Sequence, residues 1–105
     1  MANICDNKFL FQCAHNFDKY LEKFNEFEGE FEVVGRDSDG GGCLEGYIDS
    51  KWNFPIEDME KILPEKEDDP DECYFRCLSE EYGCNYVAMN IYTNGHWRDE
   101  QCFDL

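Results

Sequence analysis

The chain has 105 residues, of which 42% are hydrophobic, and this length allows one domain with a single core. Its 25 Asp and Glu residues against 9 Lys and Arg residues give a net charge of −16, which disfavours nucleic acid and anionic membranes and favours a basic partner. No apolar stretch approaches the length of a membrane span, so no membrane insertion is expected.

The first predicted element is a helix at residues 7–28. Apolar side chains recur there every three or four residues from Leu10 to Phe27, and charged side chains fill the opposite side. Gly29 is the expected end of this helix. Residues 30–34 then alternate polar and apolar side chains, which predicts a short strand.

Three consecutive glycines at 40–42 interrupt these patterns. We interpret them as a flexible joint within a single domain, between a helix and strand at 1–39 and a core at 43–105. The preceding Asp37–Gly40 stretch has acidic residues at the spacing of a calcium loop. It lacks suitable ligands at the fifth and twelfth loop positions, so it is better explained as a solvated turn.

A strand is predicted at residues 43–48. Pro55 is suited to the first turn of a short helix that Pro64 ends. Its expected inward-facing side chains are Ile56, Met59, Ile62 and Leu63. The acidic run at 65–72 is typical of a solvated loop, although it has the charge to hold calcium weakly or to bind a basic partner.

The main helix is predicted between Asp69 and Gly83. Asp69 is a capping residue, Pro70 suits the first helical position, and Gly83 is a common end signal. In this helix Cys73 and Cys77 lie one turn apart on the same side.

Residues 84–93 alternate in the manner of a strand, and Asn94 followed by Gly95 is a strong signal for a hairpin. The returning strand is expected at 96–98, and a further element reaches Cys102. These elements predict an α+β fold, in which a small antiparallel sheet stapled by disulfides packs on one main helix with an additional N-terminal helix.

Seven cysteines are many for a cytosolic protein of this length and usual for a small extracellular one. An odd number leaves one thiol unbridged or linked to another chain. The N-terminal residues have neither the basic start nor the apolar stretch of a secretory leader, so we expect a mature secreted form. Zinc sites usually show two close pairs, whereas here one Cys-x3-Cys pair stands with isolated cysteines, which favours disulfides over a metal. No cofactor is expected.

The motif Asp-Glu-Cys-x3-Cys-x6-Cys that begins at Asp71, the alternating strand after it and the later Cys102-Phe103 resemble the core of a PAN/Apple module. The resemblance covers residues 43–105. It is most similar to the small acidic leech-type modules, some of which bind collagen and block platelet adhesion. For this chain the resemblance implies a PAN/Apple-like fold and binding of an extracellular protein or carbohydrate.

The resemblance also implies two disulfides, Cys73–Cys102 and Cys77–Cys84. In the family a further cysteine near the end of the module bonds the cysteine of the opening strand, which corresponds here to Cys43. This chain ends three residues after Cys102 and lacks that cysteine. Cys5 and Cys13 are the candidates to bond Cys43, and the one that remains would be the odd thiol.

Aromatic and basic side chains gather around the predicted hairpin turn, where such residues often dominate binding energy. The candidate ligand-binding residues are Tyr92, His96, Trp97 and Arg98, with Trp52 as a second site. The alternative is that both tryptophans belong to the core. Cys13 and His15 are two positions apart and would point to different sides of a helix, so they do not form a catalytic pair, and no enzyme activity is expected.

The expected function is non-catalytic recognition of an extracellular protein or glycan, with collagen or another matrix or plasma protein as the named candidate. The alternative is a structural or assembly protein in which the odd cysteine links two chains in a dimer. A third hypothesis is a redox protein that uses the unbridged thiol, which requires an exposed cysteine with a depressed pKa.

Overall fold

The computed structural model describes residues 4–26, 29–51, 56–64, 70–81, 86–93, 95–97 and 101–104, of which 4, 50–51, 86 and 101–104 are described by their backbone alone. In chain order the elements are β1 (Ile4–Cys13), α1 (Phe17–Phe24), β2 (Gly29–Arg36), β3 (Gly42–Lys51), α2 (Ile56–Glu60), β4 (Tyr74–Glu81), β5 (Tyr86–Thr93), β6 (His96–Trp97) and β7 (Gln101–Asp104). None of the described helices is long and apolar enough to cross a membrane.

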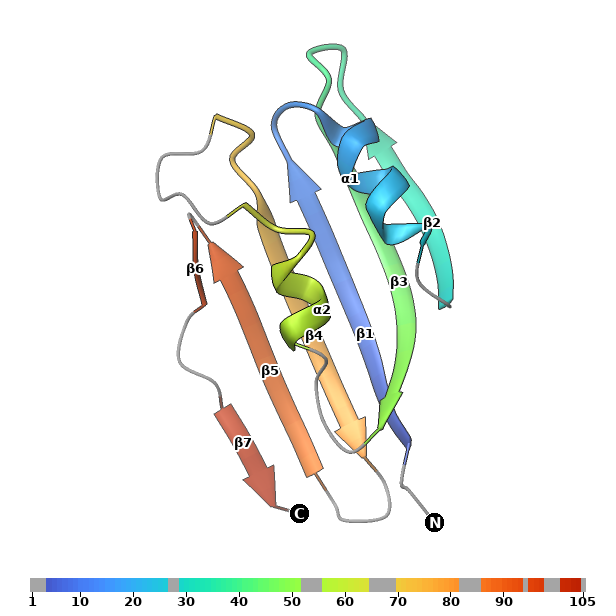
Figure 1. Ribbon diagram of the computed structural model, residues 1–105, viewed down its shortest axis with the longest axis vertical. Helices are drawn as coiled ribbons and strands as arrows, with labels where there is room; N and C mark the ends of the chain where they lie inside the picture. The colour runs from blue at the N-terminus through green and yellow to red at the C-terminus, as the bar shows by residue number, and fades with distance from the viewer. Residues whose placement is uncertain are drawn as a thin grey trace.

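The strands form one antiparallel sheet in the order β2-β3-β1-β4-β5-β6, with β7 also paired to β5. β1 and β2 run parallel to each other on either side of β3, and α1 connects them; β3 and β4 are related in the same way by α2. These two interleaved units make a split βαβ arrangement. Both helices lie on the same face of the sheet (Figure 1). The predicted α+β class, a small antiparallel sheet with few helices, is therefore confirmed.

The two central strands alternate strictly between the two faces of the sheet. In β1 the odd-numbered residues from Cys5 to Cys13 are buried, whereas Asp6, Lys8 and Gln12 are exposed. The odd-numbered residues of β4 are buried in the same way. Because successive side chains of a strand point to opposite sides, each strand gives one face to the helices and the other to solvent.

Aromatic rings fill the space between the sheet and the helices. The Phe9 ring lies 5.1 Å from Phe24 of α1 and 5.5 Å from Phe75 of β4, centroid to centroid. Phe11 lies 5.1 Å from Tyr20 and 5.2 Å from Phe24. Each such ring buries a large apolar area, and offset or tilted pairs add attraction beyond that area. This aromatic cluster holds α1 on the sheet.

A buried carboxylate also ties α1 to the start of β4. The two oxygens of Asp71 accept hydrogen bonds from Asn16 Nδ2 at 2.7 Å, Lys19 Nζ at 3.1 Å and the Tyr20 hydroxyl at 2.5 Å. Burial alone would raise the pKa of Asp71, but these donors outweigh it and the pKa lies below its ordinary value. Asp71 therefore serves as a charged tie between two elements.

The glycine run is a packed turn between β2 and β3, and the strands on its two sides belong to the same sheet. Gly40 has a φ of 93°, a conformation that side chains rarely adopt. A Cβ atom on Gly42 would lie 2.5 Å from the Phe17 ring, so a side chain there would displace the first turn of α1. Gly41 and Gly42 are thus closely packed against the segment that follows β1 and against α1.

Two predicted helices are wrong in whole or in part. The first half of the 7–28 helix is strand β1, and of the described residues in that range only Phe17–Phe24 are helical. The main helix predicted between Asp69 and Gly83 is absent from its described residues, of which Tyr74–Glu81 form strand β4 and 70–73 form a turn and an irregular segment. Cys73 and Cys77 share a face in either conformation, because a separation of four residues is an even number of strand steps. The conformation is decided by hydrogen bonding of β4 to strands on both sides.

The other predicted elements are confirmed. The strands expected at 30–34, 43–48 and 84–93 correspond to β2, β3 and β5. The hairpin at Gly95 joins β5 to β6, and Gly95 has a φ of 80°. The helix expected after Pro55 is α2, and the inward-facing residues predicted for it, Met59, Ile62 and Leu63, are buried, with Ile56 packed against the same core.

Candidate binding face

The helix-free side of the sheet, called the open face below, carries side chains from β2, β3, β1, β4 and β5. The strand register arranges them in rows that cross the sheet. Carboxylates outnumber cations on this face: it carries Asp6, Glu30, Glu32, Glu45, Asp49 and Glu80 against Lys8 and Arg76. A flat, charged surface of this kind can bind a ligand without any change in the core.

One row places three carboxylates side by side. Asp6 of β1 lies directly opposite Asp49 of β3 on one side and opposite Glu80 of β4 on the other. Partial burial, a hydrogen bond with Asp49 and the charges of Asp49 and Glu80 all raise the pKa of Asp6. Like charges directly opposite each other in a sheet repel, so this row has a favourable place for a cation.

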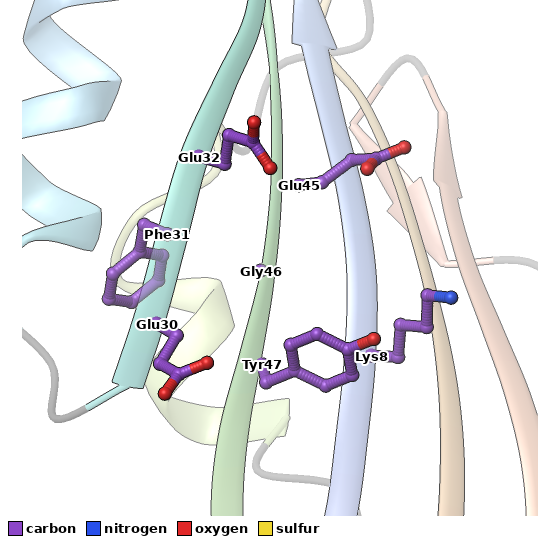
Figure 2. A pocket seen from close by; sticks show the side chains of 7 residues that line it. All are labelled: Lys8, Glu30, Phe31, Glu32, Glu45, Gly46 and Tyr47. Carbon is purple, nitrogen blue, oxygen red and sulfur yellow. The ribbon is translucent and has the colours of Figure 1, made fainter.

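The next row is centred on an exposed aromatic ring. Tyr47 of β3 is 50% exposed, lies opposite both Glu30 and Lys8, and has the Lys8 ammonium 5.8 Å from its ring centroid. A groove of about 360 Å³ runs beside it, and Figure 2 shows the carboxylates of Glu30, Glu32 and Glu45 around this groove. The groove is therefore lined by aromatic rings and three carboxylates, with Lys8 beside Tyr47.

Towards β5 the open face becomes apolar. Leu10, Leu78, Met89 and Ile91 are half-buried on adjacent strands. A second groove, of about 250 Å³, lies over Leu10, Leu78 and Met89 and extends to Glu45. The open face thus joins an acidic half around Tyr47 to an apolar strip along β1, β4 and β5.

Two of the predicted ligand-binding residues near the hairpin, Tyr92 and Trp97, pack with the core. Tyr92 is buried beneath the helices and its hydroxyl donates to the Pro64 carbonyl. Trp97 is half-buried and meets the Phe75 and Tyr92 rings edge-on, at 5.9 and 5.5 Å. These two residues belong to the core or its rim, as in the alternative interpretation.

The remaining members of that predicted site do not join Tyr92 and Trp97. His96 is exposed and lies opposite Thr93 at the far end of the open face. Arg98 and Trp52 lie outside the described residues. Among the described members of the predicted site, Tyr92 and Trp97 pack with the core whereas His96 is exposed.

The cysteines whose side chains are described contain no disulfide among themselves. Cys5, Cys13, Cys73 and Cys77 are buried, and Cys43 is half-buried. The sheet register places the backbone of Cys102 opposite Ala88, on the far side of β5 from β4. This position does not suit the bridge to Cys73 that the resemblance implied, because Cα atoms more than about 7 Å apart cannot be bridged. Cys84 lies outside the described residues, so its pairing with Cys77 stays a prediction.

The described residues offer few groups for catalysis or metal binding. Burial and the nearby Asp71 charge raise the pKa of Cys13 to about 11, and burial raises that of Cys77 to about 12. His15 is exposed and its Nδ1 lies 3.3 Å from the Asp39 carbonyl oxygen. Within the described part of the chain, no group of three His, Cys, Asp or Glu side chains is arranged to hold a metal ion.

Comparison of the chain with protein-family models, with curated proteins and with solved structures finds no significant match. Within the described residues, the open face is therefore the structural feature that suggests a function. Sequence inspection did not single out this face. Its signal was the alternation of Glu45, Tyr47 and Asp49 with buried residues along β3.

Proposed function

We propose that the protein is a non-catalytic, extracellular recognition module that binds a lysine- and arginine-rich surface of another protein through its open face. The observation that carries the proposal is the row of Asp49, Asp6 and Glu80 beside the exposed Tyr47 ring. The net charge of −16 supports the same kind of partner, because it speeds encounter with a basic protein and repels phosphates. The cysteine content supports the extracellular location.

Each part of the open face has a counterpart in such a partner. Carboxylates pair with ammonium or guanidinium groups, and Tyr47 offers a ring for cation–π contact. The apolar strip at Leu78 and Met89 can receive the aliphatic stems of lysine and arginine side chains. A cation placed between Asp6 and Asp49 would also relieve the repulsion that raises the pKa of Asp6.

The test uses a synthetic lysine-rich peptide, with its lysine-acetylated form as the neutral control. Isotope-edited NMR should show the largest shift changes in β1, β3 and β4, and the affinity should fall steeply with added salt. The double variant Asp6→Asn/Asp49→Asn should weaken binding by about 3- to 10-fold. The matched variant Glu22→Gln/Glu26→Gln removes the same charge from the α1 side. Equal weakening by both variants, or shift changes centred on α1, would refute the open face as the site.

Collagen remains the named extracellular candidate, and its test is binding to immobilised collagen at micromolar concentration. The helix that motivated it is strand β4. The open face now supplies its physical support, because an acidic surface suits the basic segments of a matrix protein. Binding to a glycan column, with no response to the lysine-rich peptide, would favour carbohydrate recognition instead.

The assembly alternative is favoured by one cysteine. Among the described cysteines, Cys43 is the one that is half-buried rather than buried, and it lies at the end of the open face opposite Gln12. A second chain that approaches this end would reach its thiol first. Non-reducing gels after treatment with oxidised glutathione should then show a dimer that Cys43→Ser abolishes, whereas a monomer throughout would contradict this alternative.

A further inference from the structure

The end of β1 and the start of β4 bring two cysteines to neighbouring positions. The β1–β4 ladder ends at the pair Gln12 and Tyr74, and Cys13 and Cys73 are the next residues of the two segments. The Ala14 amide donates to the Asp71 carbonyl oxygen at 2.7 Å, one position out of the ladder register, and Glu72, with a φ of 50°, is the extra residue at this point. The two segments therefore stay together on both sides of Cys13 and Cys73.

The two cysteine side chains also point to the same side of the sheet. Cys13 is 7% exposed and Cys73 is 5% exposed, and both belong to the core cluster beneath the helices. Opposed residues of antiparallel strands have Cα atoms about 4.5–5.5 Å apart. Disulfides need about 4.4–6.8 Å between Cα atoms, a separation that suits two residues adjoining the last pair of a ladder.

The other described cysteines are not aligned in this way. Cys5 lies opposite Glu81 while Cys77 lies opposite Phe9, which offsets these two cysteines by four positions, or about 13 Å along the strands. Cys43 lies opposite Gln12 and so points to the open face, away from Cys13. Among the described cysteines, only Cys13 and Cys73 both adjoin the same terminal pair of a ladder.

We propose that Cys13 and Cys73 form an intramolecular disulfide when the protein meets a low-molecular-weight disulfide such as oxidised glutathione. One thiol loses its proton and attacks the glutathione disulfide, which releases one glutathione thiolate and leaves a mixed disulfide. The second thiol, as thiolate, then displaces the other glutathione. The two cysteines lose two protons and two electrons in total, and oxidised glutathione is reduced to two thiols.

The bridge would fasten the segment that contains α1, β2, β3 and α2 at its two ends. It would lie beside the Asp71 tie, so a covalent and an ionic link would hold the same corner of the fold. Because burial keeps the pKa of Cys13 near 11, the reaction should be slow at neutral pH and faster at pH 9. The proposal is independent of the function assigned to the open face.

Tryptic mapping of the intact chain tests the proposal directly. Cleavage after lysine and arginine places Cys13 in peptide 9–19 and Cys73 in peptide 67–76, with no other cysteine in either. After oxidation with glutathione and alkylation of remaining thiols, peptides 9–19 and 67–76 should be recovered as one cross-linked species. Recovery of both peptides alkylated, or of peptide 67–76 linked to peptide 99–105 with Cys102, would overturn the proposal.

Unfolding measurements provide a second readout. Oxidation should raise the thermal midpoint of the wild type by roughly 10 °C, because a long closed loop restricts the unfolded chain. Cys13→Ser should lose this rise, and Cys43→Ser, which alters a cysteine outside the pair, should keep it. If Cys13→Ser fails to fold, Cys13→Ala replaces it and the peptide map of the wild type decides. An equal rise in the Cys13 variant would overturn the pairing.

Discussion

The two faces of the sheet are built from the same strands and have opposite chemistry. Phe9 and Leu10 are neighbours on β1, yet Phe9 is 2% exposed among aromatic rings while Leu10 is half-buried beside carboxylates. The face under the helices holds the apolar core, and the open face holds like charges directly opposite each other. The difference indicates that stability resides on one side of each strand, so the other side can carry residues selected for binding.

The two faces also differ in the pKa values of their aspartates. Asp71, beneath α1, has a lowered pKa because three donors surround it despite its burial, whereas Asp6, on the open face, has a raised pKa through partial burial and the nearby acids Asp49 and Glu80. The fold stabilises the anionic form of Asp71. The anionic form of Asp6 would be stabilised by a cation from a binding partner. The predictions below test this division between the two faces.

The largest loss of stability is expected when Phe9 on β1 is truncated, and its neighbour Leu10 provides the comparison. Phe9→Ala should lower the free energy of unfolding by about 3–5 kcal/mol, because it removes a ring that contacts Phe24, Phe31 and Phe75 and leaves a cavity. Leu10→Ala should cost about 1 kcal/mol, since its side chain is already partly in water. Urea unfolding measures both. Equal losses would show that the two faces do not differ in stability.

An intermediate effect is expected for Asp71→Ala. The change leaves the buried Tyr20 hydroxyl without its acceptor, and we expect a loss of about 2–3 kcal/mol at pH 7. The pKa of Asp71 is lowered on folding, so its contribution is complete above the unfolded value near 4 and is lost as the pH falls through the folded value. The difference between wild type and variant, measured by urea unfolding, should therefore shrink below about pH 4.

The exposed Glu22 on α1 provides the control for that experiment. Glu22→Ala removes a carboxylate from the same helix face of the molecule and should change stability by less than about 0.5 kcal/mol at either pH. A difference between wild type and Asp71→Ala that stays constant from pH 7 to pH 3 would contradict the charged tie, because it would mean that the ionised form of Asp71 contributes nothing.

The sequence predicted the elements whose signals are local. β2, β3 and β5 alternate clearly, and the Gly95 hairpin and α2 follow from turn and proline chemistry. β1 was missed because Asn7 interrupts the apolar alternation on its buried side. In the fold Asn7 is satisfied by Ser79 of β4 at 2.7 Å and by the Ile48 carbonyl at 2.8 Å, from residues far away in the chain.

The site was harder to predict than the fold, because it also depends on contacts between residues that are far apart in the sequence. The partners of Asp71 at the start of α1 and within it lie more than fifty residues away in sequence, so no local pattern predicts that this carboxylate is buried and bonded. The open face depends on register: Asp6, Asp49 and Glu80 form a row only once β3, β1 and β4 are aligned. Composition predicted a basic partner, but strand pairing was needed to place its binding surface.

The smallest effect is expected for Asp6→Asn, and its sign is opposite to that of Asp71. Because the pKa of Asp6 is raised on folding, its ionised form costs stability at pH 7, and this cost disappears as the pH falls through the raised value. The variant should therefore be more stable than wild type by a few tenths of a kcal/mol at pH 7, after solvent screening, and equal to it near pH 3. Asp39→Asn, in the turn before β3, changes the net charge equally and should gain less in urea unfolding. If both variants gain the same amount, the relief comes from overall charge, and the row on the open face loses its special place in the argument for a cationic partner.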